Sequence, residues 1–156
     1  MIARSLRPTK SNRLFALLKS DHKVLKTLFR EYERADLGKQ LAIAQTLIQE
    51  LGIHAELEEQ LIYPAIRHAI EEDDLLNEAA EAHHLMHVLI KELFHLTPTQ
   101  DTFQAKFKVL GEVVQRHIKE EEREMFPRAQ QKPIDWEGLY EQAHLRREHL
   151  LAKAVA

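Results

Sequence analysis

The 156-residue sequence contains no cysteine, which excludes disulfides, thiolate metal ligands and cysteine nucleophiles together. Any metal site must therefore use histidine and carboxylate side chains. Glycine and proline are also scarce, with 4 and 5 residues, which is about half of the roughly 12% that ordinary usage would supply. Few turn residues imply long elements with few connections, and this argues against all-β sandwiches and collagen-like chains.

Other shortages limit the classes of partner. Lysine and arginine number 22 against 25 aspartate and glutamate, the net charge is −3, and only 6% of the residues are aromatic. The sequence thus has neither the basic field nor the stacking platform of a nucleic-acid binder. No apolar run approaches about 18 residues, and the start of the chain lacks the apolar segment of a secretory signal. We expect a cytoplasmic chain with no nucleic-acid and no membrane partner.

Apolar residues recur at helical spacing in long segments bounded by turn signals. Four such segments cover 11–34, 39–68, 74–96 and 102–126, and a shorter fifth opens at Asp135, a plausible N-cap. Pro64 is expected to kink or end the second helix, because its ring crowds the preceding turn.

Short breaks between long amphipathic helices favour antiparallel neighbours. The sequence therefore predicts an all-α fold, an antiparallel up-down-up-down four-helix bundle with a shorter fifth C-terminal helix packed outside it. We assign the bundle to 11–130, a flexible N-terminal arm to 1–10 and a C-terminal helical extension to 131–156.

An internal repeat connects the two halves of the bundle. The segment HAELEEQLIYP at 54–64 aligns without a gap with HIKEEEREMFP at 117–127. The helices before these segments align more loosely. Matched pairs are Asp21 with Ala82, His22 with His83, His54 with His117, Glu58 with Glu121, Glu59 with Glu122 and Tyr63 with Phe126. The chain thus reads as two helical hairpins, each with one His on its first helix and a His plus Glu on its second.

Each His–Glu pair is spaced four residues apart, so both side chains project from one helix face. His54 is in phase with the apolar stripe of its helix, as is His117, so the pairs with Glu58 and Glu121 face the core. A buried unpaired carboxylate costs several kcal/mol or must take up a proton. A pair of metal ions held by these side chains, with carboxylates bridging both ions, accounts for their burial.

This pattern resembles the hemerythrin-like HHE cation-binding domains, in which a His is followed by a His with Glu four residues later, repeated once. The resemblance covers about 11–128. It implies an oxo- or hydroxo-bridged, non-heme di-iron centre with Glu58 and Glu121 as bridges and the histidines as terminal ligands. The same donors also suit zinc or manganese. By analogy, the ligand of such a centre is a small molecule such as dioxygen, nitric oxide or peroxide.

Some assignments stay open. His83 and His87 lie four apart on one face, as do two ligating histidines of oxygen-carrying hemerythrins, and spacing cannot choose between them. The fourth helix departs from the carriers, because Glu121 follows His117 by four residues instead of an Asp by five. Glu59 and its counterpart Glu122 rotate off the inward face and are expected to be solvated, with orientation of a ligand imidazole as the alternative. The aromatic residues of the repeat, Tyr63 and Phe126, are expected to pack, with restriction of access to the centre as the alternative.

The candidate metal ligands are His22, His54, Glu58, His83, His87, His117 and Glu121. Our leading hypothesis is a metal-binding, di-iron protein that binds or senses O2 or NO, or buffers iron. The first alternative is a di-iron enzyme that acts on peroxide or nitric oxide or repairs iron–sulfur centres. The second is a structural bundle whose helices are held together by any available divalent cation.

Overall fold

The computed structural model describes residues 12–70 and 74–155. The predicted N-terminal arm, 1–10, lies outside these described residues. Within them the fold is all-helical, as predicted, and contains no strand. Five rods follow one another: α1 (Arg13–Arg34); α2 (Leu37–Leu57) with η1 (Glu58–Ile62) and α3 (Tyr63–Ala69); α4 (Asp74–Leu93); α5 (Asp101–Glu120) with η2 (Glu121–Met125) and α6 (Phe126–Gln130); and α7 (Trp136–Val155).

Polar side chains cap the starts of three rods. Asn12 accepts a hydrogen bond from the N–H of Phe15 before α1, and Asp36 accepts one from Lys39 before α2. Asp135 accepts one from the N–H of Gly138 at 3.0 Å, which confirms the predicted N-cap of the last helix. These contacts satisfy amide groups that a helix start leaves without partners.

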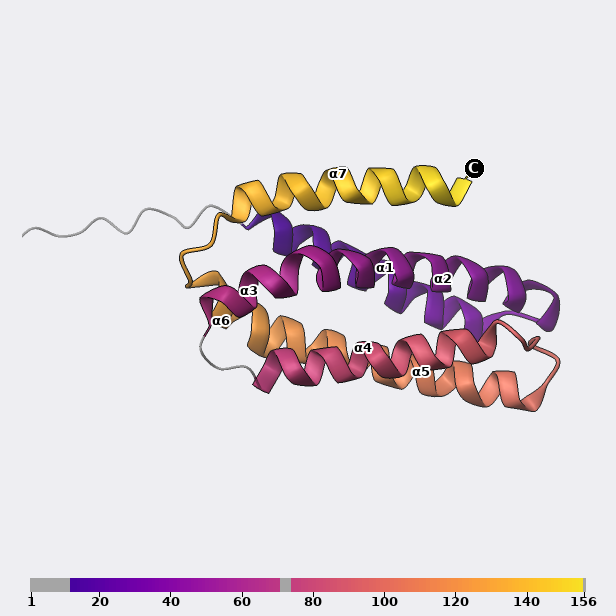
Figure 1. Cartoon of the computed structure of the whole chain (residues 1–156). Coiled ribbons are helices and arrows are strands. Elements are labelled where there is room, and N and C mark those ends of the chain that lie inside the picture. The colour runs from indigo at the N-terminus through magenta and orange to yellow at the C-terminus, as the bar shows by residue number, and fades with distance from the viewer. Residues whose placement is uncertain (1–11, 71–73, 156) are drawn as a thin grey trace, which may run out of the picture.

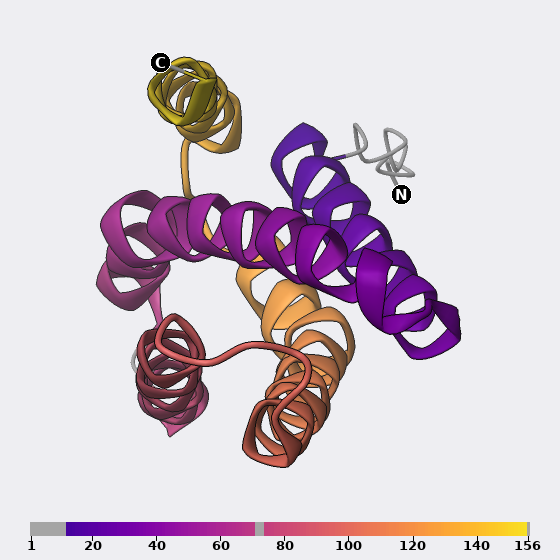
Figure 2. The ribbon, with the colours of Figure 1, turned by 90° about the vertical axis from the view of Figure 1, so that its right-hand side faces the viewer.

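The first four rods form the bundle, and α7 lies outside it along α1 and α2 (Figures 1 and 2). We call α1 with the α2–α3 rod the first hairpin, and α4 with the α5–α6 rod the second hairpin. Only Leu139 and Ala143 of α7 are buried, so this helix covers the first hairpin and is not a fifth member of the core. It is not shorter than every bundle helix, since α4 also has 20 residues.

The core falls into two apolar clusters separated by a polar layer. On α1, Leu18 belongs to one cluster and Leu25 to the other, and His22 lies between them. On the second rod, the predicted His–Glu pair lies between Leu51 of one cluster and Ile62 of the other. Each buried leucine or isoleucine contributes about 2 kcal/mol, so the two apolar clusters offset the cost of burying the polar layer between them.

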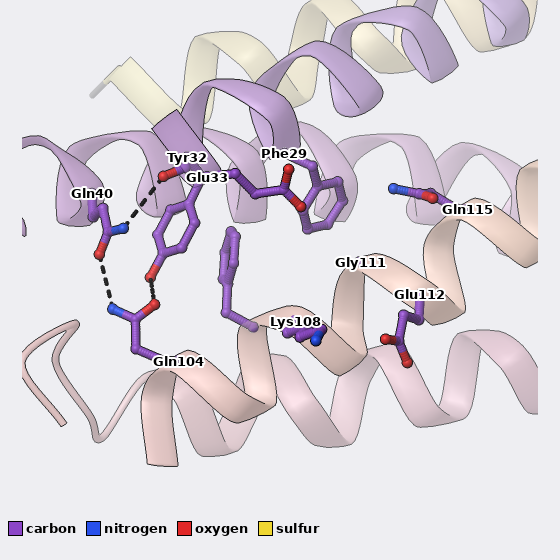
Figure 3. Close-up of a pocket in the computed structure, with 10 residues that line it drawn as sticks. Phe29, Tyr32, Glu33, Gln40, Gln104, Lys108, Gly111, Glu112 and Gln115 are labelled. Atoms are coloured by element: carbon purple, nitrogen blue, oxygen red, sulfur yellow. Dashed lines mark hydrogen bonds between the residues drawn. The ribbon is translucent and has the colours of Figure 1, made fainter. Parts of the chain in front are cut away.

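The end of the bundle away from α3 and α6 is held by a neutral polar network (Figure 3). Tyr32 donates to the side-chain oxygen of Gln104 at 3.0 Å, and Gln104 donates to Gln40 at 2.8 Å. These groups border a cavity of about 410 Å³ that has no histidine among its lining residues. The polar layer of histidine and glutamate is therefore a separate feature of the core.

Two π-helical turns follow the predicted His–Glu pairs. In the first, the N–H of Tyr63 donates to the carbonyl of Glu58, and in the second the N–H of Phe126 donates to the carbonyl of Glu121. The helix does not end at Pro64, because α3 continues to Ala69, but its regular α geometry is interrupted by the π turn of η1 just before this proline. A π turn is wider than an α turn, and it gives the proline ring room that a regular helix denies.

No helix of 12–70 or 74–155 is both long and apolar enough to cross a membrane.

Candidate metal centre

Six of the seven predicted ligands meet in the polar layer of the bundle. α1 and α4 each supply one histidine, α2 and α5 each supply another, and the two π turns begin with the glutamates. Each of the six is at most 3% exposed. They are His22, His54, Glu58, His83, His117 and Glu121. The repeat therefore brings its matched side chains to one place, as the sequence pattern indicates.

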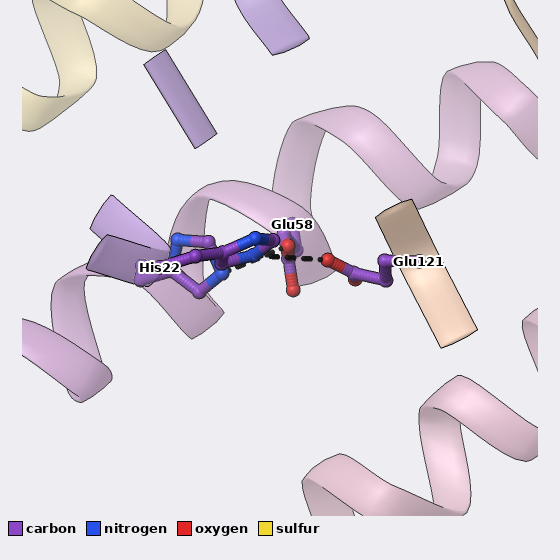
Figure 4. Close-up of side chains that lie close together, drawn as sticks. His22, Glu58 and Glu121 are labelled. Carbon is purple, nitrogen blue, oxygen red and sulfur yellow. Dashed lines mark ion pairs between the residues drawn. The ribbon is translucent and has the colours of Figure 1, made fainter. Parts of the chain in front are cut away.

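The first cluster consists of His22, His54, Glu58 and Glu121. One ligand atom from each lies within 4.8 Å of the other three. His54 Nε2 is 2.9 Å from Glu58 Oε1, and His22 Nε2 is 3.2 Å from Glu121 Oε2. Figure 4 shows the side chains of His22, Glu58 and Glu121 converging from separate helices.

All four atoms are buried, and none forms a well-aligned hydrogen bond among the described residues; their close contacts are the two histidine–glutamate pairs just given. Buried polar atoms in folded proteins nearly always form hydrogen bonds, and poorly aligned contacts leave part of their desolvation cost uncompensated. Two imidazole nitrogens and two carboxylate oxygens aimed at one point form a donor set that a divalent cation satisfies. The residues of the first cluster therefore fit a metal ion.

The second cluster consists of Glu58, His83, His117 and Glu121, again with ligand atoms within 4.8 Å of one another. His83 Nε2 is 3.0 Å from Glu58 Oε2, and His117 Nε2 is 3.0 Å from Glu121 Oε1. Each glutamate thus directs one oxygen to the first cluster and the other oxygen to the second. This division of oxygens is what a carboxylate shared by two ions requires.

The hydroxyl of Tyr63 lies among the four ligand atoms of the second cluster. Its oxygen is 3.1 Å from His117 Nε2 and 3.3 Å from His83 Nε2. Its proton can be donated to Glu58 Oε2, at 2.8 Å, or to Glu121 Oε1, which is also in contact. Tyr63 packs in an apolar cluster, as expected, but the expectation missed the contacts of its hydroxyl with the second cluster.

The π turn explains why the sequence pattern misplaced Tyr63. In an α-helix, residues five apart are about 140° apart around the axis, so Tyr63 would point away from Glu58. A π turn is closed by hydrogen bonds between residues five apart, which brings Tyr63 back over Glu58. Its counterpart Phe126 does pack as expected, with its ring stacked on Phe15 at 4.4 Å between centroids.

Glu59 and Glu122 orient two of the cluster histidines, contrary to the expectation that they are solvated. Glu122 Oε1 accepts from His22 Nδ1 at 2.8 Å, and Glu59 Oε1 accepts from His83 Nδ1 at 2.8 Å. Each side chain is 30% exposed. A carboxylate on Nδ1 fixes the ring so that Nε2 faces the metal side. The doublet of glutamates in both copies of the repeat is the sequence signal for this role.

His54 is oriented by a residue that sequence reasoning did not identify. Asp21 Oδ2 accepts from His54 Nδ1 at 3.2 Å, and Arg147 of α7 donates to the same carboxylate at 2.8 Å. The repeat holds no signal for this contact, because position 82, which matches Asp21, is alanine.

His87, the seventh predicted ligand, lies outside both clusters. Its side chain is 52% exposed, and its Nε2 is 2.7 Å from Glu59 Oε1. His83, in contrast, reaches the second cluster. A groove of about 470 Å³ is lined by His87, Glu59, His83 and Tyr63 among others, so it borders one histidine of the second cluster.

Opposite charges set the protonation of the metal-free cluster. Burial lowers the pKa of His54, but Glu58 and then Asp21 raise it, and the pKa is well above its usual value. Burial also lowers the pKa of His117, yet Glu121 raises it to about 10. Burial raises the pKa of Glu58, but His54 and His117 bring it well below the usual range. At neutral pH the two glutamates are thus ionised and faced by protonated histidines, which a cation can replace.

At Tyr63, burial and the neighbouring charges shift the pKa in the same direction. Burial, followed by the charges of Glu121 and Glu58, raises the pKa of its hydroxyl well above the ordinary value. The metal-free cluster therefore holds a neutral phenol.

Comparisons with known proteins agree with this site. The model of the hemerythrin HHE cation-binding domain matches residues 13–129. A crystal structure of a hemerythrin HHE cation-binding domain-containing protein from Mycobacterium kansasii superposes with a TM-score of 0.76 at 27% identity, covering 95% of this chain and 91% of that one.

A DNA nickase from Nostoc sp. is 27% identical over a 114-residue alignment that covers 70% of this chain and 31% of the nickase. The chain thus spans less than a third of that relative's length. The match to the HHE model, in contrast, covers most of the chain and includes every residue of both clusters. The chain belongs to the hemerythrin HHE cation-binding domain family.

Proposed function

We propose that this chain is a di-iron protein, with one iron ion in each cluster and with Glu58 and Glu121 each giving one oxygen to each ion. The single observation that carries the proposal is the set of four buried ligand atoms of the first cluster, which lie within 4.8 Å of one another and form no well-aligned hydrogen bond among the described residues. The second cluster supports a second ion, since it repeats the donor set and shares both glutamates.

The donor atoms support iron as the metal. Imidazole suits iron, copper, nickel and zinc, and carboxylate oxygen suits harder ions. The Tyr63 oxygen lies within 3.3 Å of all four ligand atoms of the second cluster. A phenol oxygen is a hard donor that favours the ferric ion, so we propose that Tyr63 is a further ligand of the second ion.

We propose that the function is to bind or sense a small molecule such as dioxygen or nitric oxide. A pair of iron ions supplies reversible redox chemistry and coordination of such molecules when bound. The residues of this chain supply the rest. Two apolar clusters exclude water from the polar layer, and the groove beside His83 and Tyr63 gives a small molecule a route from the surface.

An enzymatic role on peroxide or nitric oxide is the second candidate, and the position of Tyr63 is the observation that favours it. The Tyr63 hydroxyl holds a proton between the two glutamates and also lines the groove. In this second candidate Tyr63 keeps its proton instead of ligating the ion, so a substrate that enters by the groove would meet a proton donor beside the second cluster.

Visible spectroscopy of the iron-loaded chain tests the proposal. We expect absorption bands of a coupled di-iron centre that shift on stoichiometric addition of nitric oxide or azide, and on exposure of the reduced protein to oxygen. Rapid multiple turnover of peroxide or nitric oxide, lost in Glu58→Ala, would establish the enzymatic candidate. A loaded chain whose bands respond to none of these molecules would contradict both functions.

A further inference from the structure

The fifth helix reaches the polar layer through a single arginine. Arg147 Nη1 is 2.8 Å from both carboxylate oxygens of Asp21, and Arg147 Nη2 is 3.6 Å from Glu50. The Arg147 side chain is only 18% exposed and that of Asp21 only 7%. This is a largely buried ion pair between α7 and α1, unlike the exposed ion pairs that contribute little to a fold.

Asp21 connects Arg147 to His54, one of the proposed metal ligands. Its Oδ2 accepts from His54 Nδ1, so His54 Nε2 faces Glu58 in the first cluster. If the arginine were removed, the carboxylate would be left buried without its partner, and it would have to take up a proton or turn away. Either change alters the hydrogen bond that sets the orientation of the His54 ring.

Among residues 12–70 and 74–155, only the first hairpin has this connection. α7 packs along α1 and α2, and the position matching Asp21 in the second hairpin is Ala82, which has no carboxylate to offer His117. By contrast, the contact of Glu122 with His22 is matched by that of Glu59 with His83. The Arg147–Asp21 pair is therefore an addition to the repeat that affects one cluster.

We propose that Arg147 is a positioning residue for the first cluster, acting through Asp21 on His54, so that α7 belongs to the metal site although it supplies no ligand. This inference rests on the proposed function, because it concerns the ion proposed for that cluster. It assigns the fifth helix a role in metal affinity in addition to its cover of the first hairpin.

The test compares two neighbouring arginines of α7 in the full-length chain. Arg146 makes the same kind of contact with α2, at 2.6 Å from Glu56, but Glu56 does not contact a cluster histidine in any described interaction. Metal-free Arg147→Gln and Arg146→Gln are titrated with Co(II) against a competing chelator, which resolves two dissociation constants. For Arg147→Gln we expect one constant to rise about tenfold while the other stays within about twofold, as for other residues that orient a ligand. For Arg146→Gln we expect both constants to match wild type.

A second variant changes Asp21, the other partner of this ion pair. Asp21→Asn keeps the shape of the side chain but removes its charge, and we expect the same constant to rise about 10–100-fold. Adding Arg147→Gln to Asp21→Asn should change affinity little further, because both act through one hydrogen bond. In the Co(II) protein, the exchangeable Nδ1–H resonance of His54 should shift and exchange faster, and those of His22 and His83 should not.

The outcomes separate the inference from the proposed function. A wild-type chain that takes up two Co(II) ions, with Arg147→Gln indistinguishable from Arg146→Gln, overturns the inference alone. An equal rise of both constants in Arg147→Gln also overturns it, since that indicates a general loss of packing. A wild-type chain that takes up no Co(II) overturns the proposed function and the inference together. If Arg147→Gln does not fold, the Asp21→Asn titration decides.

Discussion

The two clusters of this protein are built from matched ligands but differ in what surrounds them. In the first, four ligand atoms form no well-aligned hydrogen bond among the described residues, and α7 contacts one of its histidines through Asp21. In the second, a phenol hydroxyl lies among the ligand atoms, and a surface groove borders Tyr63 and His83. The duplication thus explains the ligand set, and a few unmatched residues distinguish the two metal positions.

Two unmatched positions of the repeat account for most of this difference. Tyr63 has an oxygen where Phe126 has none, and Phe126 instead packs on Phe15. Asp21 has a carboxylate where Ala82 has a methyl group. A symmetric pair of ions would thus lie in an asymmetric protein, with α7 connected to the first cluster and a surface groove beside the second.

Removal of a shared glutamate should have the largest effect, because it affects both clusters. We expect Glu121→Ala, like Glu58→Ala, to lower the metal content from two ions to less than one per chain. Elemental analysis after purification measures this. Glu120→Ala is the matched control, since Glu120 makes only a surface ion pair with Arg116, and it should retain both ions. If Glu121→Ala retained full metal content and stability, Glu121 would not be a shared ligand.

Removal of a single histidine should affect one cluster. His22→Ala should lose the ion of the first cluster, and His83→Ala should lose that of the second, leaving one ion per chain in each variant. The spectrum of the remaining ion distinguishes the two, because only the ion kept in His22→Ala has the Tyr63 oxygen near it. Loss of both ions from either variant would show that the clusters cannot be filled independently.

Tyr63→Phe makes the first copy of the repeat like the second. Because the glutamates and histidines remain, we expect both ions to be retained and only the second cluster to change. The iron-loaded protein should lose the visible charge-transfer band of a phenolate on ferric iron. Phe126→Tyr is the converse variant, since it adds a hydroxyl at the matching position in the second copy of the repeat. A spectrum unchanged by Tyr63→Phe would exclude Tyr63 as a ligand.

The pH dependence of the metal-free chain should follow its histidines. The folded chain raises the pKa of His117 to about 10, against about 6.5 when unfolded. Its contribution to stability is therefore complete below about pH 6.5 and is lost as pH rises towards 10. We expect the Tm of the metal-free chain to fall by several degrees over this interval, while metal affinity rises as protons stop competing. A metal-free Tm that rose with pH would contradict the protonated state inferred for the cluster.

His87 should have the smallest effect on metal content. It is half-exposed and contacts Glu59 instead of a cluster atom, so His87→Ala should retain two ions with affinities within about threefold of wild type, as expected when only an exposed group is removed. Co(II) titration gives the answer. Loss of one ion would instead support the sequence-based prediction that His87 is a ligand.

Sequence reasoning reached the bundle and six buried side chains because the repeat fixes relative positions. The His–Glu spacing of four residues and the phase with the leucine stripe were sufficient to bring Glu58 and Glu121 inward. The π turns could not be read from that phase, since a regular period of 3.6 residues was assumed throughout. This assumption misplaced the hydroxyl of Tyr63, whose direction depends on the wider turn.

The contact of α7 with the cluster was missed for a different reason. Asp21 lies next to a recognised ligand, but its partner Arg147 is 126 residues away and has no counterpart in the repeat. Contacts between a repeat and an element outside it carry no periodic signal, so they emerge only when the chain is folded.

Elemental analysis of the freshly purified full-length chain, combined with its visible spectrum, tests the central claim most directly. The account predicts two metal ions per chain, predominantly iron, with the absorption of a coupled pair. One ion per chain or fewer, or two tightly held zinc ions without visible absorption, would contradict it.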